Sequence, residues 1–177
     1  MDKPVLKSIF KSRVTASKLK ALAQHYPADY DHEIESTVAP QVRKHGYFTK
    51  PEFESICHWK TPRSRPKVAS NSAEYIEAVT RTALSTESEQ LRIEVLTLLN
   101  GVSWPTASVI LHFCHREAYP ILDVRALWSL GVDASKVTYN FELWREYTRV
   151  CRGLAKSTGL SMRELDRALW QYSKEEQ

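Results

Sequence analysis

The sequence predicts an all-α fold, and three of its features support this prediction. Only five of the 177 residues are glycine, whereas residues with high helix propensity are common. Residues that favour helix N-caps recur ahead of amphipathic stretches from one end of the chain to the other. No pair of alternating stretches joined by a tight turn indicates a β-hairpin. We therefore expect a bundle of helices.

In the first half of the chain, capping residues and prolines set the expected helix ends. The run Thr49-Lys50-Pro51-Glu52 supplies an N-cap, an early proline and a first-turn acid. Pro40 should kink or interrupt the helix that contains it. Two prolines predict that residues 61–70 form a basic loop. The expected helices are 15–25, 32–44, 50–59 and one to residue 84 that is capped by Asn71 or Ser72.

The second half of the chain shows the same signals. Thr86 is expected to start a helix whose apolar stripe is Leu91, Val95, Leu98 and Leu99. Asp123 is a candidate N-cap for the helix that Gly131 closes. Ser161 and Glu164 together form a capping box. The remaining expected helices are 104–113, 141–154 and 161–173.

The charge distribution favours a polyanionic partner. Lysine and arginine exceed the acidic residues by 25 to 21, and the formal net charge is +4. The excess is concentrated in the first twenty residues and again between Lys60 and Lys67, whereas acids gather elsewhere. Such asymmetry is typical of a nucleic-acid-binding face. Solvated helix faces are the alternative explanation for the same pattern.

The cysteines and hydropathy predict a cytoplasmic protein. Cys57, Cys114 and Cys151 are far apart and lack the spacing of a disulfide framework or a zinc site. No apolar stretch is long enough to span a membrane, and no signal-peptide pattern opens the chain. His112 and His115 share one expected helix, but no acidic or cysteine partner accompanies them, so no metal site is predicted.

The most informative segment is the predicted helix–turn–helix at Asn100–Pro105. Gly101 allows a backbone conformation that a side chain would obstruct. Val102 is expected to fold back between the two helices, and a new helix begins near Trp104 and Pro105. The unsatisfied N–H groups at the start of that helix can then bind phosphate. Such a contact recognises nucleic-acid backbone rather than base sequence.

This segment resembles the helix-hairpin-helix superfamily of DNA base-excision glycosylases, which includes endonuclease III, and specifically a small bacterial branch of it. The usual signature LPGVGxxTA is matched here by Leu99-Asn100-Gly101-Val102-Ser103-Trp104-Pro105-Thr106-Ala107. The family's catalytic aspartate corresponds to Asp123, in the context Ile121–Arg125. Asp123 follows Pro105 by eighteen residues, the interval found in endonuclease III between the lysine of bifunctional members and the aspartate.

Three departures from the family pattern limit what the resemblance implies. Ser103 replaces the second hairpin glycine, and Pro105 stands where bifunctional members carry the lysine that forms a Schiff base. The cysteines of the iron–sulfur cluster are absent. The resemblance therefore implies a monofunctional enzyme without an iron–sulfur cluster or other cofactor, although a monovalent cation could bind at the hairpin.

The resemblance also implies a two-lobed helical architecture. One lobe is expected to comprise residues 26–119 and to contain the helix-hairpin-helix at about 91–113. The second is expected to be formed by residues 1–25 and 120–177. In the superfamily the hairpin and the aspartate lie on either side of a cleft between the lobes. The partner is expected to be duplex DNA, bound by a monomer.

Each candidate site residue has a functional and a structural interpretation. Asp123 is the candidate catalytic residue, and helix capping is its alternative role. The candidate base-pocket residues are Trp59 and Tyr47, although most aromatic side chains at helical spacing belong to a core. Arg125 could contact phosphate or form a surface salt bridge. The residues expected to contact DNA backbone are Gly101, Val102, Ser103, Trp104, Thr106, Arg125, Lys60 and Arg63.

The sequence thus supports three functions. The first is a monofunctional DNA glycosylase that hydrolyses the N-glycosidic bond of a damaged or modified base. The second is a DNA-binding module that keeps the hairpin but has lost catalysis. The third is a protein-interaction domain with a vestigial hairpin.

Overall fold

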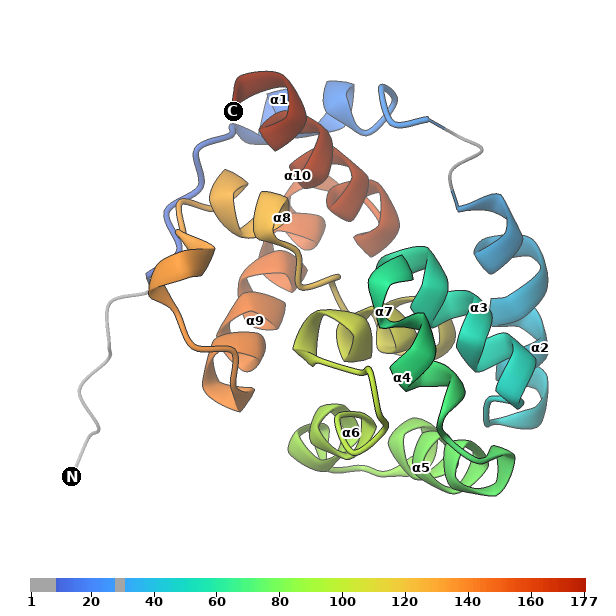
Figure 1. Cartoon of the computed structure of the whole chain (residues 1–177). Coiled ribbons are helices and arrows are strands. Elements are labelled where there is room, and N and C mark those ends of the chain that lie inside the picture. The colour runs from blue at the N-terminus through green and yellow to red at the C-terminus, as the bar shows by residue number, and fades with distance from the viewer. Residues whose placement is uncertain (1–8, 28–30) are drawn as a thin grey trace. The chain divides into compact units, whose positions relative to one another are not determined.

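The computed structural model describes residues 9–27 and 31–177, and these residues form helices joined by turns, with no strand among them (Figure 1). The predicted all-α class is confirmed. None of the helices in the described residues combines the length and apolar character needed to cross a membrane. The α-helices are α1 Ala16–Leu22, α2 Ala39–His45, α3 Lys50–Lys60, α4 Arg65–Ala69, α5 Ala73–Ser85, α6 Glu89–Leu96, α7 Trp104–Cys114, α8 Val124–Ser129, α9 Phe141–Thr158 and α10 Met162–Glu176.

The chain divides into two compact units. The terminal unit contains the described residues up to Tyr26, together with Asp123–Thr138 and Glu142–Gln177. The central unit contains the described residues of Pro27–Leu122, together with Tyr139–Phe141. The lobe boundaries that were expected from the sequence lie near residues 26 and 119.

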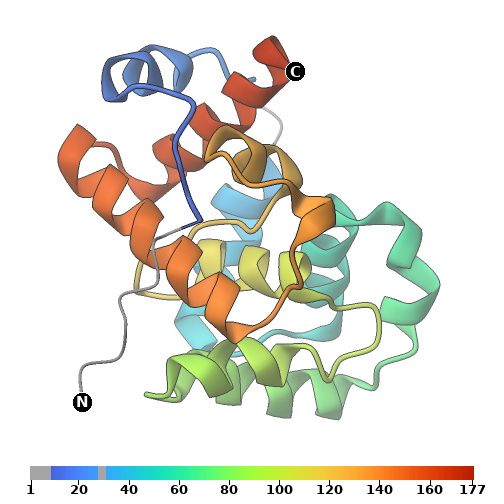
Figure 2. The ribbon, with the colours of Figure 1, turned by 90° about the vertical axis from the view of Figure 1, so that its left-hand side faces the viewer.

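The terminal unit joins the two ends of the described chain. Helix α10 packs against both α1 and α8, and Figure 2 shows α1, in blue, beside the red α10. The backbone N–H groups of Lys11 and Arg13 donate to the carbonyls of Leu130 and Ser129, each at 2.8 Å. A Cβ on Gly131 would lie 2.3 Å from the Lys11 carbonyl oxygen, so this approach requires glycine.

The central unit is built around α7. Eight of the eleven residues of this helix are buried, and it packs against α2, α3 and α6. Helices α5 and α6 lie side by side at the lower edge of Figure 1. Phe48, Phe53, Ile56, Ile93 and Ile110 are fully buried. The core of this unit therefore fixes the position at which α7 begins.

The predicted helix around Pro40 is present, with a local change of geometry. Residues Ile34–Val38 adopt a π-helical turn directly before α2, and the Ala39 N–H donates to the Ile34 carbonyl. Proline lacks an N–H and its ring collides with the carbonyl four residues earlier. A π turn is a common way to accommodate such an interruption.

The prediction that residues 61–70 form a loop is wrong. Pro62–Ser64 form a 3₁₀ turn, and Arg65–Ala69 form α4. In both elements the proline lies in the first turn, where its missing N–H costs nothing and its fixed φ suits a helix. The prolines in this segment therefore start helices rather than prevent them.

The predicted start of the helix before the hairpin is also wrong, and so is its predicted apolar stripe at Leu91 and Leu98, whereas Leu99 of that stripe is buried. Ser88, not Thr86, is the N-cap of α6, and its side chain accepts from the Leu91 N–H. Leu91 and Leu98 are 46% and 60% exposed, whereas α6 buries Arg92, Ile93 and Leu96. Arg92 can be buried because its guanidinium donates to the Tyr119 hydroxyl and the Thr86 carbonyl.

Candidate nucleic-acid interface

The hairpin begins where α6 tightens and ends. The N–H groups of Thr97, Leu98 and Leu99 each donate to the carbonyl three residues earlier. Gly101 then adopts a φ of +82°, in the left-handed region that favours glycine. Val102 is buried, and its N–H donates to the Leu99 carbonyl at 3.1 Å. The predicted roles of the glycine as turn residue and of Val102 as a buried contact are thus present in the structure.

Helix α7 starts without a side-chain cap. Ser103 is its N-cap, but the serine hydroxyl does not accept from the first turn. The first hydrogen bond of the helix runs from the Ala107 N–H to the Ser103 carbonyl, at 2.8 Å. Among the described residues, the backbone N–H groups of Ser103, Trp104 and Thr106 donate to no acceptor. Unsatisfied donors at the positive end of a helix dipole are suited to an anion.

Asn71 holds the hairpin in place, a role that sequence reasoning missed. Its side chain is buried; the amide nitrogen donates to the carbonyls of Val68 and Asn100 at 2.8 and 3.0 Å. Its amide oxygen accepts from the Asn100 N–H at 2.9 Å. The sequence left Asn71 and Ser72 as alternative caps. The structure assigns the cap of α5 to Ser72, which leaves Asn71 for the hairpin.

Helix α4 and the turn before it lie against the hairpin. A Cβ on Gly101 would come within 2.7 Å of the Val68 Cγ2 and 3.0 Å of the Val68 backbone nitrogen. The hydroxyls of Thr61 and Thr106 are 3.2 Å apart. Arg63, Arg65 and Lys67, on this same segment, are exposed, and Lys60 is half-buried. The tertiary fold therefore brings basic side chains beside the open start of α7, an arrangement that the predicted loop did not specify.

Asp123 caps α8, as its alternative role predicted. Its Oδ1 accepts from the Arg125 N–H at 2.9 Å, and the side chain lies at the surface of the terminal unit, half-buried. Burial raises the pKa of Tyr147 well above its usual value, and the charges of neighbouring acidic groups, Asp123 among them, raise this pKa further. The cap and the half-buried position are compatible with a catalytic role.

The side chain of Arg125 contacts an aromatic ring of the terminal unit. Its guanidinium lies over the Trp170 ring, 5.5 Å from the centroid, and the Lys174 amine lies 5.1 Å from the same ring. Such contacts leave the positive charges at the surface while the aromatic ring holds them in place. The structure thus adds an aromatic partner for Arg125 that neither sequence alternative included.

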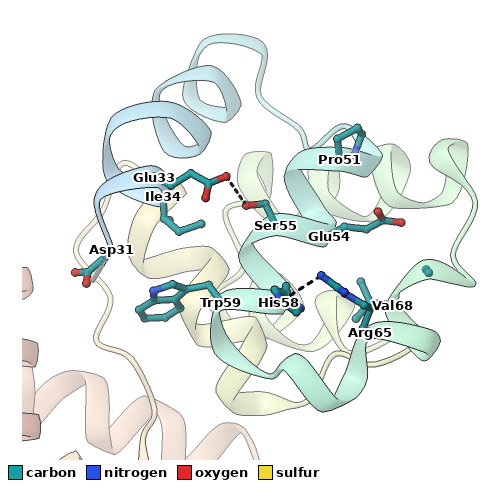
Figure 3. A pocket seen from close by; sticks show the side chains of 11 residues that line it. Asp31, Glu33, Ile34, Pro51, Glu54, Ser55, His58, Trp59, Arg65 and Val68 are labelled. Carbon is teal, nitrogen blue, oxygen red and sulfur yellow. Dashed lines mark hydrogen bonds between the residues drawn. The ribbon is translucent and has the colours of Figure 1, made fainter. Parts of the chain in front are cut away.

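The two candidate base-pocket residues occupy different surroundings. The Tyr47 ring lies 4.3 Å from the Arg81 guanidinium and 4.7 Å from the His45 ring. Trp59 lines a pocket of about 780 Å³ in the central unit, between the start of the π-helical segment, α3 and α4 (Figure 3). Tyr47 is not among the residues that line it. Trp59, but not Tyr47, therefore borders a space large enough for a base.

His112 of α7 and His115, the C-cap of this helix, form hydrogen bonds with backbone groups. The Nδ1 of His112 donates to the Tyr119 carbonyl at 2.6 Å, and the Nδ1 of His115 accepts from the Glu117 N–H at 3.0 Å. Burial lowers the pKa of His115, which favours its neutral form. Within residues 9–27 and 31–177, no group of three histidine, cysteine or acidic side chains is arranged to hold a metal ion.

Comparisons with known proteins give one structural likeness. No protein-family model matches the chain, and no curated protein matches it. Among solved structures, the 8-oxoguanine DNA glycosylase of Methanocaldococcus jannaschii is similar, with a TM-score of 0.45 and 18% sequence identity. The match covers 89% of this chain and 78% of that chain.

Proposed function

We propose that this chain is a monofunctional DNA glycosylase that binds duplex DNA backbone at the start of α7 and cleaves an N-glycosidic bond with the help of Asp123. The observation that carries the proposal is the uncapped start of α7, where Ser103, Trp104 and Thr106 present unsatisfied N–H groups. Where a helix has a side-chain cap, the capping side chain accepts from one of the free N–H groups of the first turn. The free N–H groups of an uncapped helix start that lies beside exposed arginine and lysine are best satisfied by the oxygens of a phosphate.

Asp123 supplies the group that hydrolysis requires. As the base leaves C1′ with the bonding electrons, the sugar acquires positive charge, and a nearby carboxylate stabilises this state. The carboxylate also orients the water whose oxygen forms the new bond to C1′, and it accepts the proton that the water releases. The cap bond from the Arg125 N–H occupies one of the roughly four lone-pair positions of an ionised carboxylate.

Pro105 supports the monofunctional form of the reaction. A lyase step of the lysine type needs a primary amine to form a Schiff base with the sugar. Proline at this position in the first turn of α7 has no such amine. The expected product is therefore an abasic site in an uncut strand.

A second function is favoured by one observation. The Asp123 carboxylate already performs a structural task, as the cap of α8. A chain that retained Asp123 for this reason alone would bind DNA through the hairpin without cleaving it.

The two functions are separated by assaying base release and DNA affinity together. Duplexes carrying uracil, oxidised, alkylated or hypermodified bases are incubated with the protein, and abasic sites are counted. Asparagine is as good an N-cap as aspartate, so Asp123→Asn should fold normally. We expect it to reduce base release by at least about a hundredfold, the usual effect of losing a catalytic acid–base group, with DNA affinity within about twofold of the wild type.

The outcomes assign the function directly. Base release that survives Asp123→Asn removes Asp123 from the mechanism. Salt-dependent DNA binding without release from any duplex supports the binding module instead. Affinity that does not change with salt contradicts both functions, because both depend on contacts with phosphate.

A further inference from the structure

The segment that leads to Asp123 is buried although it has no regular secondary structure. All the residues of Tyr119–Leu122 are buried, and Tyr119 and Leu122 are fully so. Leu122 ends this stretch of the central unit, and its peptide bond leads directly to Asp123, where the terminal unit resumes. The position of the Leu122 backbone therefore determines where the main chain of Asp123 begins.

Two side chains of α7 hold this segment at its two ends. The Ser108 hydroxyl accepts from the Leu122 N–H at 2.8 Å. The Nδ1 of His112 donates to the Tyr119 carbonyl at 2.6 Å. Because Ser108 and His112 are four residues apart, they lie on the same face of the helix. One face of α7 thus carries both attachments.

Ser108 also contacts the first turn of α7. Its hydroxyl donates to the Pro105 carbonyl at 2.7 Å, and the Ser108 side chain is fully buried. Since a carbonyl only accepts and an N–H only donates, the hydroxyl proton is directed at Pro105 and a lone pair at Leu122. A single atom, the Ser108 Oγ, therefore joins the start of the hairpin helix to the residue that precedes Asp123.

The Leu122 N–H depends on this oxygen. Among the described residues, it donates to no other acceptor. A buried N–H that loses its partner is costly, and native proteins leave few such groups unpaired. The main chain relieves such a loss by moving toward another acceptor or toward water, and the residue that moves with Leu122 is Asp123.

We propose that Ser108 is a positioning residue, which fixes the main chain from which the Asp123 carboxylate acts. The inference rests on the proposed function, because that function makes Asp123 the catalytic group. A carboxylate that stabilises charge on the sugar and orients water acts over hydrogen-bond distances. A displacement of about 1 Å at such a group lowers a rate by about a hundredfold. Ser108 itself is fully buried and acts only through the Leu122 backbone.

Thr80 provides a matched control in the same unit. It is fully buried in α5; its hydroxyl donates to the Ile76 carbonyl at 2.7 Å and accepts from the Phe48 N–H at 2.9 Å. Both hydroxyls thus join a helix to a distant backbone N–H, but the Thr80 hydroxyl holds the segment before α3. Ser108→Ala and Thr80→Val each remove one such hydroxyl.

Base release and DNA affinity are measured for both variants, and urea denaturation gives their stabilities. Release is followed in a single turnover, with protein in excess over a duplex that the wild type cleaves. Ser108→Ala should slow release by about ten- to a hundredfold. Its Kd for a duplex with a stable abasic-site analogue should stay within about twofold of the wild type, because the N–H groups at the start of α7 are unchanged. Thr80→Val should lose similar stability and keep both the rate and the Kd.

A second variant covers the case in which Ser108→Ala does not fold. Ser108→Cys has a side chain of similar size whose sulfur is a weaker acceptor than oxygen. Its rate of base release should lie between those of the wild type and Ser108→Ala, again with an unchanged Kd.

Amide hydrogen exchange tests the positioning without catalysis. The Arg125 N–H donates to the Asp123 Oδ1, so its exchange rate reports whether the aspartate keeps its place. Ser108→Ala should speed exchange at Arg125 by about tenfold, as the loss of one hydrogen bond would give. Thr80→Val should speed exchange at Phe48 and leave Arg125 unchanged.

Three results would overturn the inference: unchanged exchange at Arg125 in both Ser108 variants, equal slowing of base release by Ser108→Ala and Thr80→Val, or a loss of rate that a parallel loss of DNA affinity explains. Failure of the proposed function has a different signature. A wild type that releases no base from any duplex, with faster Arg125 exchange in Ser108→Ala alone, would remove the glycosylase and leave standing the assignment that Ser108 positions Asp123.

Discussion

The starts of α7 and α8 differ in whether a side chain accepts a hydrogen bond from the N–H groups of the first helical turn. Both helices begin with an N-cap residue in an extended conformation, Ser103 and Asp123 respectively. Asp123 accepts from the first turn of its helix, whereas Ser103 does not. The N–H groups at the α7 start are therefore left without a side-chain cap, whereas the cap bond to the Arg125 N–H orients the Asp123 carboxylate. The proposed function assigns DNA backbone to the first of these helix starts and the sugar to the second.

The largest expected effect tests whether the α7 start depends on its close contact with α4. Gly101→Ala should lower the free energy of unfolding by about 3 kcal/mol, of which about 1 comes from a left-handed alanine and the rest from the collision with Val68. Urea denaturation measures the change. DNA affinity should fall as well, because the turn can no longer hold the first N–H groups of α7 in place.

Gly46 provides the matched control for this substitution. It also has a positive φ, +75°, but a Cβ there would meet nothing within 4 Å. Gly46→Ala should therefore cost only about 1 kcal/mol and leave DNA affinity unchanged. Equal losses at the two glycines would show that the contact between the hairpin and α4 contributes no stability.

A smaller effect tests the contrast between the two caps directly. Asp123→Ala should lower the free energy of unfolding by about 1 kcal/mol, because the Arg125 N–H loses its acceptor. Ser103→Ala should change it by less than about 0.5 kcal/mol, because the Ser103 side chain makes no cap bond. Thermal unfolding of the two variants under one set of conditions compares them. A larger loss at Ser103 than at Asp123 contradicts this account of the two helix starts.

The local elements could be predicted from the sequence because their signals are local. The N-cap at Thr49, the capping box at Ser161, the turn at Gly101 and the cap at Asp123 each depend on residues within four positions of one another. The errors came where packing decided the outcome. Leu91 and Leu98 fit an apolar stripe by spacing, but α6 ends at Leu96 and buries a different face.

The tertiary parts of the site could not be predicted in this way. Asn71 reaches a hairpin that lies twenty-nine residues away in sequence, and its type alone indicated a helix cap. The pocket joins Asp31, α3 and α4, and nothing in the sequence shows that these segments meet. The polar face of α3, with Glu54, His58 and Trp59 at intervals of four and one, was the one signal that could have indicated it.

The most direct test of the account is whether both helix starts respond to one DNA molecule. Backbone amide resonances of the ¹⁵N-labelled protein are followed by NMR during titration with a duplex that carries a stable abasic-site analogue. We expect the amides of Ser103, Trp104 and Thr106, and those of Val124 and Arg125, to shift along binding curves with the same Kd. Shifts at the start of α7 with none at the start of α8 would contradict the proposal that the chain binds DNA backbone at the start of α7 and cleaves an N-glycosidic bond with the help of Asp123.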